Sequence, residues 1–513
     1  MHRKGAFWGL PGSWLIIACA LLSLVCWGIL AGLYWLPDYY DIPAFSLDKL
    51  PGYSASPTFR LTVVLFVALA LFYSLGLWAI VRATRSQPLT RSIKLVLALW
   101  IVGGGVAMLF MYPITALDVF TYLTVLKGPY FYGQNPYLVT VAMRPNDPWT
   151  AFDFVPGNPA LYGPGWLSMS ALPALFINWN DLLSGLFALK GFNLLLLALT
   201  GVIIARYQDD PSKRWLAAWV FLANPLVLFE GVGNGHNDIY AVVALAGAML
   251  ALKRRSVLVL PLLALSISVK FLTVILVPLF AVPLLAERWG WRKLAVGAGL
   301  ALLVAVGVTA PFWAGGEMLS GLMDSAENYY QFPGSSILLM AYAYLQQSGA
   351  SGDSAMLLLP MLTVPVVLTC GWTAWRYLRG GSFTLAAVAM LLVALQFLTR
   401  YCQWYLLFPL LFVALDRERI GTTMLTVVMA LNLIWYPVIV WAFFDSGLPQ
   451  MGIQWLGVAF LTAPTLALVG WWAWREGGLS GLWRRRRALV SAPAVPGEEP
   501  AAPRDEPGQE EGE

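Results

Sequence analysis

The sequence has 513 residues, of which 59% are hydrophobic and only 12% are charged, and it contains 24 tryptophans. Soluble domains average about 25% charged residues, so this composition excludes an ordinary soluble protein and indicates a polytopic membrane protein. The number of apolar segments of about 20 residues, rather than the total length, therefore determines the architecture.

Three apolar segments near the N-terminus carry no charge and each predicts a transmembrane helix: Trp14 to Trp35, Leu61 to Val81 and Leu95 to Pro113. Arg3 and Lys4 precede the first segment, and no small-residue cleavage site follows it. We therefore expect a retained span rather than a secretory signal, and a cytoplasmic N-terminus.

Lysine and arginine recur between the later apolar segments, as they do in short cytoplasmic loops. Seven basic clusters can face the cytoplasm together: Arg82 to Lys94, Arg206 to Arg214, Lys253 to Arg255, Arg288 to Lys293, Arg376 to Arg379, Arg417 to Arg419, and Arg484 to Arg487. This path predicts an all-α polytopic protein with about 14 transmembrane helices (range about 12–15) and both termini in the cytoplasm.

The number and course of the helices are ambiguous in two regions. Pro164 to Ile177 is expected to dip into the membrane or to lie along its surface. Val257 to Val269 and Phe271 to Leu285 form either a pair of short helices or one bent helix.

The chain divides into a transmembrane domain, residues 1–488, and a tail, residues 489–513. The domain carries two long extracytoplasmic loops, residues 113–162 and 314–336. The tail is rich in proline and glutamate, holds seven acids and one arginine, and is expected to be disordered and cytoplasmic. Because the tail contributes a charge of −6 to the net +5, the domain carries +11, which suits attraction to anionic lipid.

The sequence lacks the motifs of common metal, disulfide and nucleotide-binding sites. The four cysteines, Cys19, Cys26, Cys370 and Cys402, show no metal-binding or disulfide spacing and are expected to be buried hydrophobic residues. No phosphate loop, dinucleotide fingerprint or zinc-protease motif occurs in a suitable context, and no nucleic-acid motif is present.

Polar clusters instead gather in the loops that alternate with the basic ones, which places them on the extracytoplasmic side. They comprise Asp118, "GVGNGHND" from Gly231 to Asp238, Lys270, the loop from Gly315 to Ser336, and "TRYCQWY" from Thr399 to Tyr405. Ionisable groups at a membrane boundary cost free energy unless they are hydrated or paired, so they are candidate functional residues.

Each candidate has a plainer interpretation. Asp118 could simply cap a helix that begins near Val119, and the asparagine or aspartate of "GHND" could cap the next helix after a glycine turn. Lys270 and Arg400 could extend to the lipid headgroups. Two further sets have equally plain interpretations: Glu317, Asp324 and Glu327 as a solvated loop, and the loop aromatics Tyr130, Tyr132, Tyr137, Trp149 and Tyr162 as an interfacial belt.

The order and spacing of several short motifs then suggest a family. A third span running into "PITALDVFTY" is followed by "GQNPY", "ALYGPGWLSMS", "NPLVLFEGVGNGHND", "SVKFL" and "QWYLLFPLL". This arrangement resembles the polyprenyl-phosphate-mannose-dependent α-mannosyltransferases of bacterial membranes, in particular the α-1,6-mannosyltransferases of lipomannan assembly within the GT-C superfamily. The resemblance extends from about Trp14 to Trp474.

The resemblance implies a GT-C-like fold in the bacterial cytoplasmic membrane. It also implies transfer of a sugar, expected to be mannose, from a lipid-linked phosphate to a glycan or glycolipid acceptor outside the cell. An inverting transfer needs one carboxylate to deprotonate the acceptor hydroxyl, and Asp118 is the candidate base. Lys270, Arg400, His236 and Asn237 are candidates for the donor phosphate. Candidate substrate-binding residues are Tyr122, Asn135, Tyr137, Tyr162, Asp238, Gln403 and Trp404.

Two positions depart from the family pattern. Ala116 and Leu117 precede Asp118 where Ser-Arg is usual, and Asn135 stands where an aspartate is common. These departures bear on the identity of the sugar and the acceptor more than on the type of reaction.

Two questions stay open at the level of sequence. No cofactor is predicted, and a divalent metal is undecided because Asp118, Asp238 and Glu317 would need to converge to bind one. A transporter or lipid flippase is the alternative function, since broken helices and intramembrane charges also suit substrate coupling.

Overall fold

The computed structural model describes residues 13–43, 57–84, 88–286, 289–319, 358–397 and 401–415, with isolated positions between 336 and 348 and between 426 and 470. In these residues the regular elements are helices, and the only β feature is a bridge between Trp35 and Met111. The chain is therefore an all-α polytopic membrane protein, as the composition predicts. Asp324, Glu327, Arg400 and the tail 489–513 lie outside the described residues.

Five described helices are long and apolar enough to cross a membrane. They are α1 (Ser13–Leu33), α3 (Pro57–Thr84), α4 (Arg91–Leu109), α8 (Leu182–Tyr207) and α14 (Trp291–Thr309, continued by η6, Ala310–Phe312). A helix of 20 residues rises about 30 Å, which matches the hydrocarbon core. The first three confirm the early predicted spans. The predicted total of about 14 includes regions outside the described residues and stays a prediction.

Two apolar stretches are interrupted, and the segments that follow these breaks contribute residues to the candidate site. Between α9 (Pro211–Leu222) and α10 (Pro225–Leu228) the path bends by 55°, because Pro225 cannot continue a helix and Asn224 caps the new one. A π-helical turn, η4 (Phe229–Gly233), follows α10 directly. The second break separates α12 (Val259–Val269) from η5 (Phe271–Leu276) and α13 (Val277–Ala286), and Lys270 stands there in an extended conformation.

The remaining helices complete the described bundle. α11 (Asp238–Lys253) packs between α8 and α12, while α18 (Leu358–Leu378) and α19 (Phe383–Phe397) pack against each other. The chain then returns through η9 (Gln403–Leu406) into α20 (Leu407–Leu415), which contacts α19 and α9. All of these elements belong to one compact unit that ends at Leu466.

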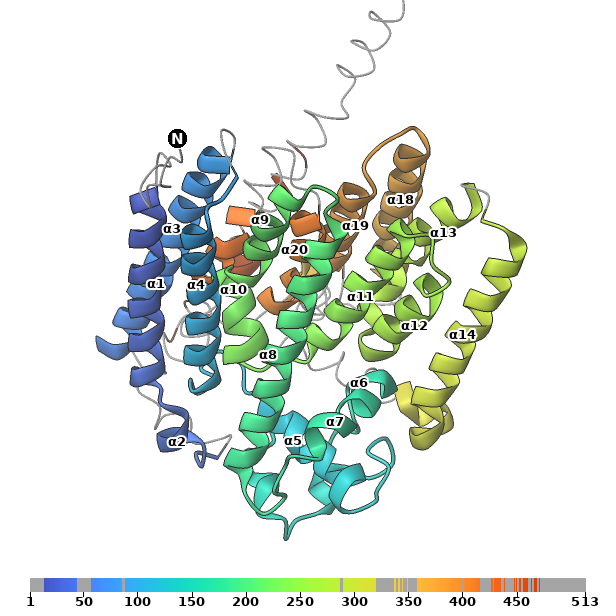
Figure 1. Cartoon of the computed structure of the whole chain (residues 1–513). Helices are drawn as coiled ribbons and strands as arrows, with labels where there is room; N and C mark the ends of the chain where they lie inside the picture. The colour runs from blue at the N-terminus through green and yellow to red at the C-terminus, as the bar shows by residue number, and fades with distance from the viewer. Residues whose placement is uncertain are drawn as a thin grey trace, which may run out of the picture. The chain divides into compact units, whose positions relative to one another are not determined.

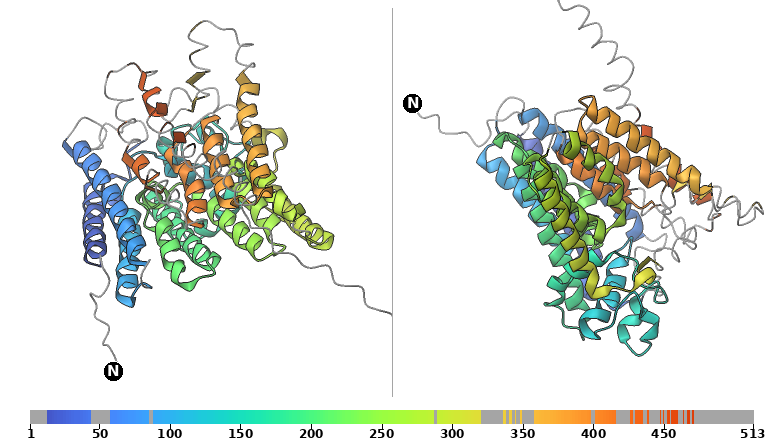
Figure 2. Two further views of the ribbon diagram at one scale, coloured as in Figure 1. Left: turned by 90° about the horizontal axis from the view of Figure 1, so that it is seen from above. Right: turned by 90° about the vertical axis from the view of Figure 1, so that its right-hand side faces the viewer.

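Short helices form a separate layer at one end of the long ones. α5 (Asp118–Phe131), α6 (Pro164–Met169) and α7 (Ala171–Ala174) lie together at the lower end in Figure 1, and the same segments occupy the lower end in the right-hand view of Figure 2. The layer also holds the turns η2 (Val141–Met143) and η3 (Pro148–Phe152). We call it the loop layer. Neither α6 nor α7 is long enough to span a bilayer, in agreement with the prediction for Pro164 to Ile177.

Two glycines allow the loop layer to touch the broken helix directly. A Cβ atom on Gly163 would lie 2.0 Å from the carbonyl oxygen of Ser268, and one on Gly165 would lie 2.8 Å from the Ser268 carbonyl carbon. Both distances are far below van der Waals contact, so only glycine fits. This contact places Tyr162, which precedes the first glycine, beside the Lys270 break.

Candidate active site

Polar side chains converge where the start of α5, the π-helical turn, the Lys270 break and η9 meet. Each of these backbone segments is irregular or begins a helix, so its side chains are directed by turns rather than by a continuous helical face. Within a membrane, irregular backbone occurs where it is covered by protein or lines a cavity. The resulting cluster unites most of the candidate residues from across about 290 positions of sequence.

Asp118 is the accessible carboxylate of this cluster. Its side chain is 31% exposed, and its Oδ2 atom lies 3.7 Å from Nδ1 of His236 and 3.5 Å from the hydroxyl of Tyr162, which donates to it. It is the first residue of α5, but the cap position belongs to Leu117 and no side chain caps the helix. The helix-cap interpretation of Asp118 is therefore not supported.

Glu230 is the carboxylate that the sequence analysis missed. It stands in the π-helical turn, is fully buried, and has three polar partners within 3.1 Å. Asn234 donates to Oε2 at 2.8 Å, Gln403 donates to Oε1 at 2.7 Å, and Nε2 of His236 lies 3.1 Å from Oε2. A buried acid with this many partners is held in one position.

His236 lies between the two carboxylates. Its ring is fully buried, with Nδ1 facing Asp118 and Nε2 facing Glu230. Trp404 stacks on the imidazole at a centroid distance of 4.1 Å and an interplanar angle of 21°. Asn193 of α8 donates to the backbone carbonyl of His236 at 3.0 Å, which fixes the turn. The imidazole is thus contacted on one face by Trp404 and on both edges by carboxylates.

Lys270 and Asp238 form a second charged pair in the cluster. Nζ of Lys270 lies 2.9 Å from Oδ2 of Asp238, and the two side chains are 13% and 0% exposed. The ammonium group also lies 5.5 Å from the ring centre of Tyr162 and 4.9 Å from that of Tyr405, within the range of cation–π attraction. Lys270 is therefore paired inside the protein instead of extending to the headgroups.

Tyr162 connects the two charged groups. Its hydroxyl reaches Asp118 while its ring covers Lys270. Burial, with the nearby Asp118 carboxylate adding to it, raises the pKa of Tyr162 well above its ordinary value, so the phenol remains a hydrogen-bond donor. Tyr122 packs edge-on against Tyr162 at 5.0 Å and donates to Oδ1 of Asn237 at 3.3 Å. Asn237 does not cap α11 with its side chain.

Asn135 and Tyr137 lie outside this cluster and hold the loop layer. Asn135 donates to the backbone carbonyl of Phe312 at 3.1 Å, which joins the layer to the end of α14. Tyr137 donates to the carbonyl of Tyr162 at 2.7 Å and so fixes the backbone beside the site. The structure gives both residues supporting contacts and brings neither to Asp118.

A further polar network stabilises the loop layer itself. Lys127 and Asp147, both buried, form an ion pair at 2.8 Å, and Lys127 also lies 4.2 Å from the Trp149 ring centre. Asp153 accepts from Thr124 at 2.6 Å and from Thr121 at 3.1 Å. Burial raises the pKa of Asp153 despite these donors. These contacts fix the helix that begins at Asp118.

Within the described ranges, no group of three histidine, cysteine, aspartate or glutamate side chains is placed to hold a metal ion. Glu317 belongs to the short turn η7 (Gly315–Leu319), after the end of α14. The described residues therefore do not identify a binding site for a divalent metal.

The sequence is similar to a known protein family over the region that holds most of the candidate site. A family model described as "Alpha-(1->6)-mannopyranosyltransferase, N-terminal domain" matches residues 19–287, just over half of the chain. This region contains Asp118, Glu230, His236 and Lys270 but ends before η9. No solved structure shows a significant match.

Two curated relatives carry the printed name alpha-(1->6)-mannopyranosyltransferase A. The chain is 29% identical to the one from Corynebacterium glutamicum over 177 residues, which are 34% of this chain and 36% of the relative. It is 26% identical to the one from Mycobacterium tuberculosis over 338 residues, 59% of this chain and 62% of the relative. The matched regions thus span less than two thirds of either relative.

Proposed function

Because the chain belongs to the alpha-(1->6)-mannopyranosyltransferase family, we propose that it is a membrane glycosyltransferase that transfers mannose to a glycan or glycolipid acceptor. The donor in this proposal is a polyprenyl-phosphate sugar. Its isoprenoid tail remains in lipid while its phosphate and sugar reach the irregular backbone at the membrane boundary. The two mannosyltransferases that resemble the chain support mannose as the sugar.

The assignment of Asp118 as the base depends on the difference in side-chain exposure among the three carboxylates of the site. Glu230 and Asp238 are fully buried, whereas the Asp118 side chain is 31% exposed and can meet an acceptor hydroxyl. In the proposed step the acceptor oxygen forms a bond to the anomeric carbon as the bond to the phosphate oxygen breaks. The acceptor proton passes to Asp118, the electron pair leaves with the phosphate, and a β-linked donor gives an α-linked product.

His236 and Glu230 would then act through Asp118. An imidazole held between two carboxylates can orient the accessible one and share its proton after transfer. The contacts around His236 favour this positioning role over binding of the donor phosphate, because both ring nitrogens already face carboxylates. Asn237, whose carbonyl accepts from Tyr122, lies beside it and can still offer its amide.

Lys270 is the proposed cation for the leaving phosphate. It is one tyrosine side chain away from Asp118, is partly exposed, and stands in the broken helix at the membrane boundary. A pairing with Asp238 can be exchanged for a pairing with phosphate, because the two anions present similar oxygen acceptors. Arg400, outside the described residues, is proposed as a second cation.

The site is proposed to face the extracytoplasmic side, with both termini in the cytoplasm. The alternation of basic and polar loops along the chain supports this orientation, because short cytoplasmic loops are rich in lysine and arginine. Nucleotide sugars are absent on the outer side, which suits a lipid-linked donor.

A reconstitution experiment tests this function. The purified protein in lipid vesicles is supplied with synthetic polyprenyl-phosphate mannose and short mannose-containing acceptors, and products are identified by mass spectrometry. We expect an acceptor extended by one mannose and stoichiometric release of polyprenyl phosphate. Extension from nucleotide-linked mannose but not from the lipid donor would contradict the donor assignment.

A transporter is the second candidate, because a helix interrupted at Lys270 carries a buried charged pair with Asp238. The same vesicles separate the two functions. A transporter would move the labelled lipid-linked sugar across the bilayer without covalent change, whereas the proposed enzyme consumes it.

A further inference from the structure

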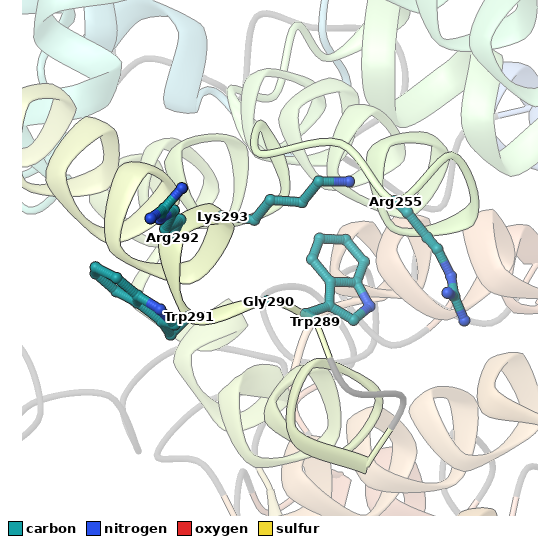
Figure 3. A pocket seen from close by; sticks show the side chains of 6 residues that line it. All are labelled: Arg255, Trp289, Gly290, Trp291, Arg292 and Lys293. Carbon is teal, nitrogen blue, oxygen red and sulfur yellow. The ribbon is translucent and has the colours of Figure 1, made fainter.

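A pocket of about 310 Å³ opens at the beginning of α14, and nothing in the proposed reaction uses it. Six residues line it: Arg255, Trp289, Gly290, Trp291, Arg292 and Lys293 (Figure 3). In Figure 3 the extended side chain of Lys293 lies above the Trp289 ring and that of Arg255 lies to its right, while Trp291 and Arg292 lie farther to the left. We call it the α14 pocket.

The α14 pocket lies at the opposite end of the bundle from the candidate active site. α11 begins at Asp238 in the site and ends at Lys253, two residues before Arg255. Its 16 residues rise about 24 Å. α14 runs from the pocket to the loop layer, where Ser168 donates to the carbonyl of Val308 at 2.9 Å. Two helices therefore separate the pocket from the chemistry by most of a membrane thickness.

The positive charges that line the α14 pocket favour binding of an anion. Three of its lining side chains are cationic and none of the six is acidic. Arg292 and Lys293 stand in the first turn of a 19-residue helix, where the helix dipole already contributes positive charge, and the cap residue Gly290 offers no side chain. The positive end of the helix dipole repels these two cations. A bound anion would reduce this repulsion.

Two further observations point into the same pocket. The Trp289 side chain is only 9% exposed, and its indole N–H has no hydrogen-bond partner within the part of the chain that the structure describes. A buried donor of this kind is costly unless a ligand satisfies it. Arg255 has a φ of 51°, the only described non-glycine residue with a positive φ. Arg255 thus stands in a left-handed backbone conformation that glycine adopts without strain.

The surface beside the α14 pocket indicates where the anion comes from. Trp291 is 74% exposed at the start of α14, and farther along the helix Val296, Leu302 and Leu303 are 53%, 65% and 69% exposed. Only 6% of the apolar window of this helix is buried. An acyl chain can lie along this face while its headgroup enters the pocket, and a tryptophan at headgroup level suits the boundary.

We propose that the α14 pocket binds the phosphate headgroup of an anionic membrane lipid at the boundary opposite the candidate active site. Arg292, Lys293 and Arg255 pair with the phosphate, and the indole N–H of Trp289 donates to one of its oxygens. The proposal does not depend on the proposed function, since it concerns other residues and the other end of the bundle.

Lipid binding to the full-length protein in detergent tests the proposal. Native mass spectrometry and thermal unfolding are measured with phosphatidylglycerol, with phosphatidylcholine and with inorganic phosphate. We expect phosphatidylglycerol to remain bound and to raise the unfolding temperature, and the other two additives to do neither at the same concentration. An equal effect of inorganic phosphate would identify a free-anion site and overturn the lipid assignment.

Matched double variants locate the site. Arg292→Gln/Lys293→Gln should weaken phosphatidylglycerol binding at least tenfold. Arg91→Gln/Lys94→Gln removes two cations from the first turn of α4, which does not line the pocket, and should leave binding unchanged. Equal loss in both variants would show a general attraction to a basic face and overturn the proposal.

A milder variant keeps the test valid if the double variant folds poorly. Trp289→Phe preserves an aromatic ring but removes the indole N–H, and it should weaken phosphatidylglycerol binding several-fold. Unchanged lipid binding by Trp289→Phe in a protein that unfolds at the wild-type temperature would remove Trp289 from the site and contradict the proposed contact.

Discussion

At the scale of single residues, the candidate site contains three carboxylates in three environments. Asp118 is accessible, Glu230 is buried among neutral donors and an imidazole, and Asp238 is buried against a lysine. Carboxylates with different surroundings can serve different roles in one site. Each role gives a distinct expectation for the variant that removes the charge but keeps the shape.

Glu230→Gln should lower kcat about tenfold, the change that about 1.4 kcal/mol of lost transition-state stabilisation produces, with little change in the donor KM. The reason is that an amide still fills the space but no longer pairs with His236. Steady-state kinetics across pH provide the measurement, and the pH profile of kcat should change as well. An unaltered pH profile with only a reduced active fraction would indicate a purely structural residue.

Lys270→Gln should raise the donor KM about tenfold or more, because a hydrogen bond to a charged partner contributes about 1.5–3 kcal/mol. The single variant also leaves Asp238 buried without its cation, which should lower the unfolding temperature. In the double variant Lys270→Gln/Asp238→Asn we expect the stability to recover while the high KM remains. A double variant with the wild-type KM would rule out a phosphate-binding role for Lys270.

At the level of elements, the π-helical turn after α10 and the break between α12 and η5 hold Glu230 and Lys270 in the candidate site. The sequence predicts either a pair of short helices or one bent helix around Lys270, and the sequence analysis did not predict the break at Pro225. The structure has two pieces joined by a 3-10 segment. Local patterns show where a helix is interrupted, but the direction of the next segment depends on tertiary packing.

Glu230 illustrates what sequence patterns could not supply. It lies in the run "NPLVLFEGVG", and a single acid in such a run was a detectable signal of function. Its partners were not detectable, because a π-helical turn has no simple sequence signature and Gln403 is 173 residues away. The convergence of Asp118, His236 and Lys270 was predictable because the basic loops assign all three to one side.

Gly163→Ala tests the contact between the loop layer and α12. The added methyl group would lie 2.0 Å from a backbone oxygen, so the helix and the loop must separate. Overpacking of this kind costs about 1–3 kcal/mol, and thermal unfolding should show the loss. Transfer activity should fall too, because Tyr162 moves with the loop.

The matched control for this contact is Gly157→Ala, in the same layer. A Cβ atom there meets nothing within 4 Å, so stability and activity should be unchanged. Equal stability of the two alanine variants would mean that Gly163 is not held against the Ser268 carbonyl.

At the scale of the whole molecule, the account requires one orientation in the membrane. In the proposed orientation the described basic clusters, including the α14 pocket, face the cytoplasm, and the loop layer with the candidate site faces the extracytoplasmic side. The family assignment does not determine this orientation, because it rests on sequence similarity alone.

Thiol labelling of intact cells measures the orientation. In a variant without the four native cysteines, Gly157→Cys in the loop layer should react with a membrane-impermeant maleimide added outside. Arg91→Cys, at the start of α4, should react only after permeabilisation. The reverse pattern would place the candidate site in the cytoplasm and contradict a lipid-linked donor on the outer side.

Asp118 is proposed to remove the acceptor proton, and the rate of mannose transfer by Asp118→Asn decides whether it does. General-base catalysis contributes about 10²–10⁴-fold, so the purified variant should transfer mannose slower by that factor while unfolding at the wild-type temperature. Asp181→Asn is the control, because Asp181 does cap a helix, α8, and asparagine caps equally well. Wild-type turnover by Asp118→Asn would contradict the account.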